Sequence, residues 1–400
     1  MDPRIRLLPH QWLLCAGLIG ILCVPHAYWN NLYGVLFAAA VLILYRRDCA
    51  ALDMRPLSVS VLGPGVWVFL LMSVLCALWA AFPLDSLRVA LFYLSGFTLS
   101  YVAAASFRER KTAEKLTGCI YAALVLTAVY GLIIYFVGKE TYFVPMGDRL
   151  YPRLSSTMEH GINYSELVAM GLPLCLVWAA QREQRQRRIA YMALLLFPLA
   201  ALVLTYSRTG WIALGLALII LLWFWNKKLL IPAALLGLTG LLLLPEGIQA
   251  RFLSMLHFND ASASGRFTLW GECLAMLRRH WLAGVGLGPE NFYNGYLPFA
   301  TGLLDFQPPH ANMGYLEIFL STGIVGFAGF MWFFFGVFVR LGRTLRRITN
   351  NRERWELYGL TASLTGAALA NIPEHIWFYP RVLFFWCVLF GLAMGRTVAE

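Results

Sequence analysis

Four arginines have the residue type and the surroundings for binding an anionic group. Arg208 lies in a short segment between two strongly apolar stretches, so the chain cannot carry it far from a membrane. An arginine at the centre of a membrane helix costs roughly 2.5–3.5 kcal/mol, and less near the interface, so Arg208 needs a partner. Arg266, Arg153 and the weaker candidate Arg149 lie in two longer connecting segments. Because a guanidinium group is a planar fork of donors suited to phosphate oxygens, we predict a phosphate or diphosphate site.

A histidine that precedes an apolar stretch is the best candidate for proton transfer. His310 follows Pro308 and Pro309, which fix the approach of the chain to a helix beginning near Met313. The unperturbed pKa of histidine, near 6.5, allows a neutral ring that accepts a proton. We therefore predict that His310 is a general base, with His160 and His375 as rivals. The structural alternative is an interfacial histidine whose ring lies half in water.

Sequence signatures of metal or nucleotide sites are missing. The chain has no HExxH or DxD motif, no carboxylate cluster and no Walker motif. The eight cysteines form no CxxC pair, so small buried side chains are the favoured interpretation. We therefore expect neither a metal nor a cofactor, and no nucleotide. The energy for any reaction must come from an activated substrate, and a lipid-borne one is expected.

The composition is that of a membrane protein, since 60% of the residues are hydrophobic and 13% are charged. Soluble domains carry roughly 45–50% apolar and about 25% charged residues. We predict an all-α fold, a polytopic membrane helical bundle in which residues 1–400 form one integral-membrane domain with about twelve transmembrane helices. The expected spans are residues 9–26, 30–45, 60–82, 87–107, 115–137, 163–180, 189–206, 210–226, 229–245, 313–339, 356–371 and 382–395.

The basic residues supply a topology and argue against nucleic acid as a partner. The net charge is +11, but the Lys and Arg residues form short clusters between apolar stretches, as expected for contacts with anionic membrane lipids. With these spans, 22 of the 32 Lys and Arg residues fall on one side, which the positive-inside rule makes cytoplasmic, with both termini. The other side carries Arg88, Lys139, Arg149, Arg153, Arg208, Arg251, Arg266, Arg278, Arg279 and Arg381. An anionic ligand explains such charges, and ion pairs with Asp85, Glu159 or Glu374 are the structural alternative.

Two extracytoplasmic loops exceed ordinary turn length, residues 138–162 and the larger residues 246–312 between the ninth and tenth spans. In the larger loop an apolar set recurs at helical spacing: Phe267, Trp270, Leu274, Leu277 and Trp281. We expect an amphipathic helix with Ser264 as its N-cap and Arg266 in its first turn, where free N–H groups favour an anion. Gly284 to Pro289 should end it.

Three blocks resemble the O-antigen ligase and polymerase superfamily of bacterial inner-membrane proteins, and they follow the family order over roughly half of the chain. They are Thr205 to Trp211, then Ser264 to Arg266 with Trp270 and the glycines 284, 286 and 288, then His310 to Glu317 leading to Thr322 to Gly326. The segment Arg153 to Pro173 is also similar to the family.

The resemblance implies a glycosyltransferase that uses a polyisoprenyl-diphosphate-linked glycan, in which arginines hold the diphosphate and a histidine deprotonates the acceptor. By position, Arg208 and Arg266 match the family arginines, with Arg153 beside them. The usual histidine position falls on Asn312, which cannot be a base, so His310 is the candidate. Possible supporting residues are Asn312, Ser207, Tyr315 and Arg149.

The first functional hypothesis is an O-antigen ligase that transfers O-polysaccharide from undecaprenyl diphosphate to the lipid A–core acceptor. It implies a multi-pass inner-membrane protein with a periplasmic, metal-independent site and inversion at the sugar. An O-antigen polymerase and a protein O-oligosaccharyltransferase use the same donor and stay open. A transporter or lipid flippase is the alternative from another functional class. Transporters commonly have charged or broken helices at the middle of the membrane, whereas here the unusual charges lie at the extracytoplasmic ends of the spans, which favours catalysis at the membrane surface.

Overall fold

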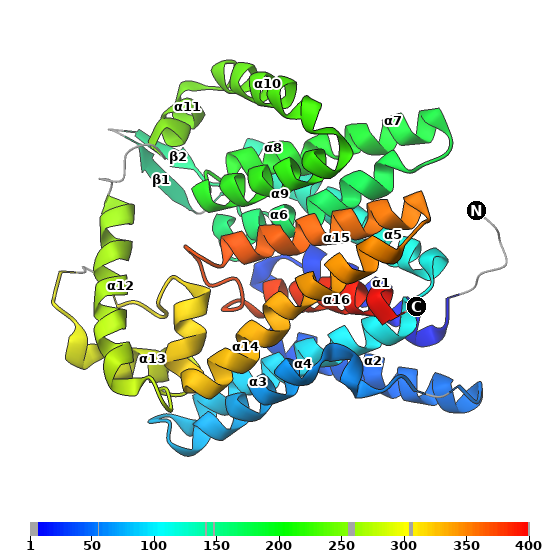
Figure 1. The fold of residues 1–400 in the computed structure, drawn as a ribbon. Helices are drawn as coiled ribbons and strands as arrows, with labels where there is room; N and C mark the ends of the chain where they lie inside the picture. The colour runs from blue at the N-terminus through cyan, green and yellow to red at the C-terminus, as the bar shows by residue number, and fades with distance from the viewer. Residues whose placement is uncertain are drawn as a thin grey trace.

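The computed structural model describes residues 7–54, 56–140, 142–146, 149–254, 261–303 and 307–398, and it is almost entirely helical (Figure 1). The helices of the first half are α1 (Pro9–Cys23), α2 (Asn31–Ala51), α3 (Pro64–Leu75), α4 (Pro83–Ser106), α5 (Arg110–Phe136), α6 (Gly161–Ala180), α7 (Arg185–Leu194) and α8 (Leu196–Leu204). Those of the second half are α9 (Arg208–Asn226), α10 (Leu230–Leu242), α11 (Glu246–Leu253), α12 (Ala261–His280), α13 (Pro289–Tyr296), α14 (Gly314–Arg347), α15 (Asn351–Ala370) and α16 (Pro380–Val398).

Short elements complete the chain. Strands β1 (Phe143–Met146) and β2 (Arg149–Pro152) form an antiparallel hairpin in which Phe143 faces Pro152. Single turns of 3₁₀ helix occur at His26–Tyr28, Val59–Leu62, Cys76–Leu78, Lys227–Leu229 and Leu297–Phe299.

The all-helical class is confirmed, and every expected apolar stretch overlaps a helix. Among the described residues, seven helical stretches are long and apolar enough to cross a membrane, and α1 and α3 are shorter apolar helices. Helix α10 has 13 residues, and α7 and α8 divide one expected span between them. The chain is therefore a helical polytopic membrane protein, and about twelve crossings remain a prediction.

Helices α6 and α16 form the centre of the bundle, because they are apolar and buried around their whole circumference. Helix α16 packs along α4, α6 packs between α15 and α9, and α14 packs along α3. A Cβ atom at Gly391 would lie 2.2 Å from the carbonyl oxygen of Ser100, and one at Gly395 would lie 2.5 Å from that of Ala104. Small residues four apart thus let α16 and α4 approach backbone to backbone.

Helix α14 is interrupted at Gly323, whose φ of 68° is left-handed and suits glycine. The segment that follows α12 lies against this break. The N–H groups of Val285 and Gly286 donate to the carbonyl oxygens of Leu320 and Ser321, and the N–H of Ile324 donates to Trp281. The break therefore ties the end of the larger loop to α14.

Helix α12 differs from its prediction in both its start and its packing face. It begins at Ala261, so Ser264 is not its N-cap, and Arg266 lies in the second turn rather than among the free N–H groups. The face that packs on α13 and α14 is Leu269, Cys273 and Met276. The predicted face is partly open, with Phe267, Leu274 and Trp281 55%, 50% and 51% exposed. Two apolar stripes lie side by side on this helix, and its neighbours decide which one is buried.

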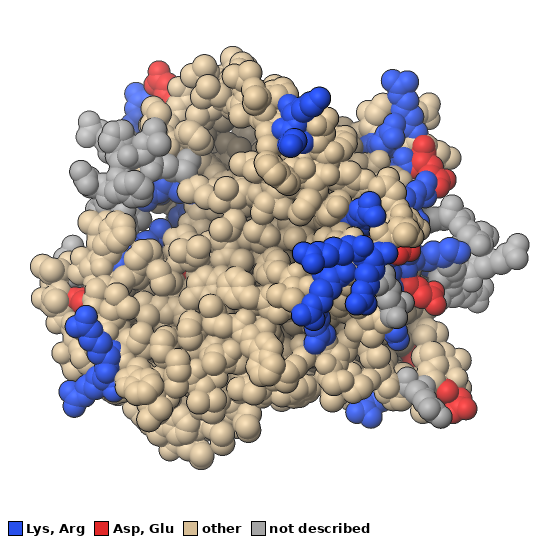
Figure 2. Space-filling model, in the orientation of Figure 1, with Lys and Arg blue, Asp and Glu red and all other residues tan. Residues whose placement is uncertain are grey.

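The loop elements and the C-terminus lie at opposite ends of the bundle. In Figure 1 the hairpin β1–β2 and helices α11, α12 and α13 lie at the left, while the C-terminus lies at the right. Figure 2 shows many Lys and Arg side chains over the right-hand end, where α14 ends in Arg346 and Arg347. Which end faces the cytoplasm remains the prediction made from the basic residues.

Candidate functional site

The turn between α8 and α9 is the scaffold of the site. Ser207 caps α9 by accepting from the N–H of Gly210 at 3.3 Å, and the hydroxyl of Ser165 donates to the same oxygen at 2.8 Å. Tyr206 has a φ of 51°, a conformation that non-glycine residues rarely adopt and that clusters at functional sites. The cap and this sharp turn make Arg208 the first residue of α9.

Two other arginines converge on this turn. The Nε atom of Arg153 donates to the carbonyl oxygen of Thr205 at 2.7 Å, and the Nε atom of Arg251 donates to that of Tyr206 at 3.2 Å. Burial and the charge of Arg251 lower the pKa of Arg153 to about 10. A pKa lowered by a neighbouring cation indicates that the two guanidinium groups lie close enough to repel each other.

Arg266 joins the group from α12 by an ion pair with Glu374. Glu374 belongs to residues 371–379, the loop between α15 and α16, and the side chain of Thr209, next to Arg208, acts to lower the pKa of its carboxyl group. Burial raises the pKa of Glu374, although the charges of Arg266 and Arg153 act against this shift. We call Arg153, Arg208, Arg251 and Arg266 the arginine cluster, because they come together at the turn before α9 and at the nearby carboxyl group of Glu374.

His310 lies beside the arginine cluster in a tightly fixed loop. Its Nδ1 atom accepts from the N–H of Asn312 at 3.1 Å, and Asn312 has a φ of 48°. The N–H of Ala311 donates to the carboxylate of Glu317 on α14 at 2.8 Å, and the indole of Trp270 donates to the carbonyl oxygen of Ala311 at 3.1 Å. These bonds from α12 and α14 position the histidine.

A second histidine faces the first. The ring centres of His310 and His375 are 5.7 Å apart, and the ring of Phe378 lies 4.4 Å from that of His310. Burial, and then the charge of Arg266, lower the pKa of His310 to about 4. Burial, and then His310, also lower the pKa of His375. Both rings are therefore neutral near pH 7.

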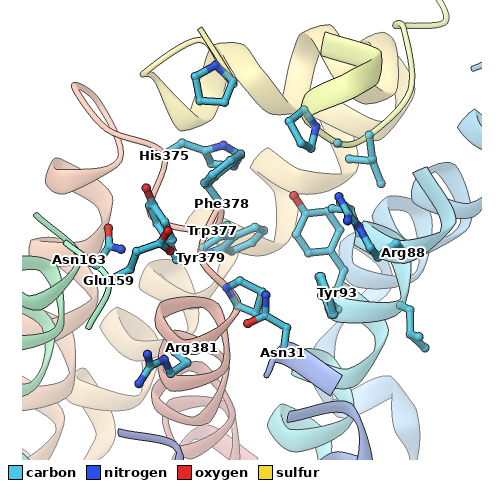
Figure 3. Close-up of a pocket in the computed structure, with 18 of the residues that line it drawn as sticks. Asn31, Arg88, Tyr93, Glu159, Asn163, His375, Trp377, Phe378, Tyr379 and Arg381 are labelled. Atoms are coloured by element: carbon cyan, nitrogen blue, oxygen red, sulfur yellow. The ribbon is translucent and has the colours of Figure 1, made fainter. Parts of the chain in front are cut away.

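His375 also lines a cavity of about 840 Å³ (Figure 3). Its volume lies within the roughly 300–1,000 Å³ of ordinary ligand sites. Glu159, Asn163 and Tyr379 line one wall, and Arg88 lies across from them. Pro309, the residue before His310, also lines the cavity, so the cavity lies next to both histidines.

The structure brings together most of the residues singled out from the sequence. The arginine cluster includes Arg153, Arg208 and Arg266, and His310 lies beside it. Ser207 positions Arg208, and the backbone N–H of Asn312 holds His310. Two supporting candidates lie elsewhere. Arg149 is exposed on the hairpin, and the hydroxyl of Tyr315 donates to Ala368 on α15.

The ion-pair alternative applies to several arginines. Arg266 pairs with Glu374 and Arg88 pairs with Asp85, while Arg381 donates to the carbonyl oxygen of Val24 and lies over the ring of Trp29. His160, the other rival base, caps α6 and packs on Tyr142.

Sequence reasoning did not select Arg251 or Thr209 for the site. The one signal for Arg251 was its place among the ten basic residues on the disfavoured side. Thr209 is an ordinary residue inside a family block and carries no signal of its own. Within the described part of the chain, no group of three or more His, Cys, Asp or Glu residues is arranged to hold a metal ion.

Fold and site together define a polytopic helical membrane protein with a cationic site between buried histidines and the ends of its helices. Residues 190–331 match the O-antigen ligase family, which confirms the resemblance predicted from the sequence. The match covers the middle of the chain and shows a likeness to this family over those residues. The matched segment contains Arg208, Arg251, Arg266 and His310.

The comparison with curated proteins found no match. Among solved structures, the chain is similar to a chain from work titled "Structural coordination of polymerization and crosslinking by a peptidoglycan synthase complex". The two are 17% identical, the alignment covers 84% of this chain and 96% of that chain, and the TM-score is 0.48. A likeness at this level carries no argument about function.

Proposed function

We propose that this protein is an O-antigen ligase of the bacterial inner membrane, with its site on the periplasmic side and both termini in the cytoplasm. It transfers O-polysaccharide from undecaprenyl diphosphate to the lipid A–core acceptor. The observation that carries the proposal is the arginine cluster at the start of α9, beside two buried histidines. The match to the O-antigen ligase family supports the same reaction type.

The proposed chemistry uses the charge of the arginine cluster in place of a metal ion. A diphosphate on the anomeric carbon is already an activated leaving group. As its bond to the sugar breaks, negative charge grows on the diphosphate, and preorganised guanidinium groups stabilise that charge. A neutral histidine takes the proton of the acceptor hydroxyl, which is worth roughly 10²–10⁴-fold in rate. Attack from the face opposite the diphosphate inverts the anomeric configuration.

The reaction products separate this proposal from its alternatives. Purified protein is incubated with undecaprenyl-diphosphate-linked glycan and rough lipopolysaccharide, with a chelator and without nucleotide. Lipopolysaccharide that carries the glycan supports the ligase. Longer lipid-linked chains indicate an O-antigen polymerase, glycan on a protein acceptor indicates an oligosaccharyltransferase, and the absence of any new glycosidic bond supports the transporter class.

A matched pair of variants tests whether the arginine cluster matters for this reaction. Arg266→Ala removes a member of the arginine cluster, whereas Arg278→Ala removes an exposed arginine from the end of the same helix, α12. We expect the first to lose transfer and the second to retain it. Equal activity of the two variants would contradict the diphosphate role of the arginine cluster.

A further inference from the structure

His375 is a buried histidine whose hydrogen-bonding capacity is unused. It is 6% exposed, and neither Nδ1 nor Nε2 has a hydrogen-bond partner within the described part of the chain. Buried polar groups are normally paired, and an exception in a native structure calls for an explanation. Since the ring lines the cavity of about 840 Å³, a ligand in that cavity can supply the missing partner (Figure 3).

His310 has a different hydrogen-bonding state, and it limits what the ring can do. Its Nδ1 atom accepts from the N–H of Asn312, so the lone pair of that nitrogen is occupied. In a neutral imidazole one nitrogen accepts and the other carries the proton. The proton of His310 is therefore on Nε2, where the ring is a donor. To act as a base, His310 would first have to break its bond to Asn312.

The cavity has the lining expected for a sugar with a lipid attached. Its wall combines the rings of Trp377 and Tyr379, on which the apolar face of a sugar can pack, with the polar side chain of Asn163. The cavity is also lined by Arg88, whose guanidinium group suits a phosphate, and by Leu91, which is exposed as a lipid-facing residue would be. A hydroxyl-rich glycolipid head fits this set of residues.

We infer that His375 is the catalytic base and that it contacts the attacking hydroxyl of an acceptor glycolipid in this cavity, while His310 acts as a hydrogen-bond donor on the side of the arginine cluster. The inference rests on the proposed function. The acceptor oxygen forms its bond to the anomeric carbon as the bond from that carbon to the diphosphate oxygen breaks. The hydroxyl proton passes to a ring nitrogen of His375, and the electron pair of the broken bond leaves with undecaprenyl diphosphate.

An acceptor that has no proton to lose separates a base from a structural residue. Azide is such a nucleophile, and its attack gives a glycosyl azide without general-base help. We expect His375→Ala to lower kcat for transfer to rough lipopolysaccharide by roughly 10²–10⁴-fold. The same variant should form glycosyl azide at the wild-type rate. His310→Ala should lose both reactions, because the donor side is damaged, and His280→Ala, on α12 outside the cavity, should lose neither.

Two results would overturn the assignment of His375. One is full transfer to lipopolysaccharide by His375→Ala, and the other is an equal loss of both reactions in that variant, which indicates a structural role. His375→Gln provides a second check, since it retains hydrogen bonding without basicity and should behave as the alanine variant does. A wild type that is inactive toward both acceptors contradicts the proposed function itself, whereas an active wild type with an active His375→Ala contradicts only the base assignment.

Discussion

The ion pair between Arg266 and Glu374 allows a double-mutant test of what Arg266 does. The side chains are 23% and 8% exposed, so the pair is largely shielded from solvent. If Arg266 only neutralises Glu374, removing both residues should restore what removing Arg266 alone destroys. If Arg266 also binds the donor diphosphate, the double variant should stay defective. The perturbations are Arg266→Ala, Glu374→Gln and the combination of the two.

The stability part of this prediction follows from burial. Breaking a buried ion pair typically costs about 3–5 kcal/mol. We expect the lower end for Arg266→Ala, because the charge of Arg153 still favours the ionised form of Glu374. The loss should shrink as the pH falls. Burial raises the folded-state pKa of Glu374 above its unfolded value, so the folded state binds the proton more tightly and stability falls as the pH rises. Thermal unfolding at pH 5 and pH 8 in detergent measures this.

The functional part follows from the strength of a guanidinium–phosphate contact. A hydrogen bond to a charged group contributes about 1.5–3 kcal/mol, which corresponds to roughly 10–150-fold in kcat/KM for the donor. We expect that loss in Arg266→Ala and in the double variant, but a smaller one in Glu374→Gln. Donor kcat/KM in the double variant equal to that of Glu374→Gln would refute the diphosphate role and leave Arg266 as a structural residue.

Three further predictions concern the residues around the site. Burial and the charge of Arg266 lower the pKa of His310 to about 4, so protonation of this ring should not reduce the transfer rate until the pH approaches 4. A pH–rate profile in which the transfer rate falls near pH 6.5, the ordinary pKa of histidine, would disagree. Gly323→Ala should detach the larger loop from α14 and abolish transfer, because a Cβ atom there lies 2.2 Å from the carbonyl oxygen of Leu282. Gly336→Ala, where the nearest atom is 4.0 Å away, should be tolerated. Limited proteolysis and transfer assays check both variants. Glu272→Gln should raise KM or lower kcat moderately, because its carboxylate holds the loop before His310 through Thr301; wild-type kinetics would contradict this.

The helices were predictable because a membrane imposes one local rule on each of them. A chain in lipid must satisfy its own backbone hydrogen bonds, so an apolar stretch becomes a helix wherever it crosses. That rule located a helix in every expected span but not the ends of these helices, and it did not apply to α11 and α13 in the larger loop. Residues 60–82 were expected as one span, for example, whereas α3 covers Pro64–Leu75 and is followed by a 3₁₀ turn. The packing face of α12 was also beyond this rule, because two apolar stripes compete on that helix.

The site was predictable one residue at a time but not as an arrangement. Arg208, Arg266 and His310 had signals in their own neighbourhoods: a charge at the membrane edge, a family block and a proline-fixed junction. Glu374 was only one of several possible partners, and the pairing of His375 with His310 depends on two loops that are 65 positions apart in the chain (375 − 310). Such a contact follows from the tertiary packing of α14, α15 and α16, which no local pattern encodes.

The most direct measurement of the account is the balance of products in one reaction. Purified protein, undecaprenyl-diphosphate-linked glycan and rough lipopolysaccharide are incubated with a chelator, and both the conjugated lipopolysaccharide and the free undecaprenyl diphosphate are quantified. We expect one undecaprenyl diphosphate released for each glycan joined, with inverted anomeric configuration, and both products formed roughly 10–150-fold more slowly in Arg266→Ala at low donor concentration. Glycan that stays on its lipid carrier in the wild type, or conjugation at the wild-type rate in Arg266→Ala, would contradict this mechanism.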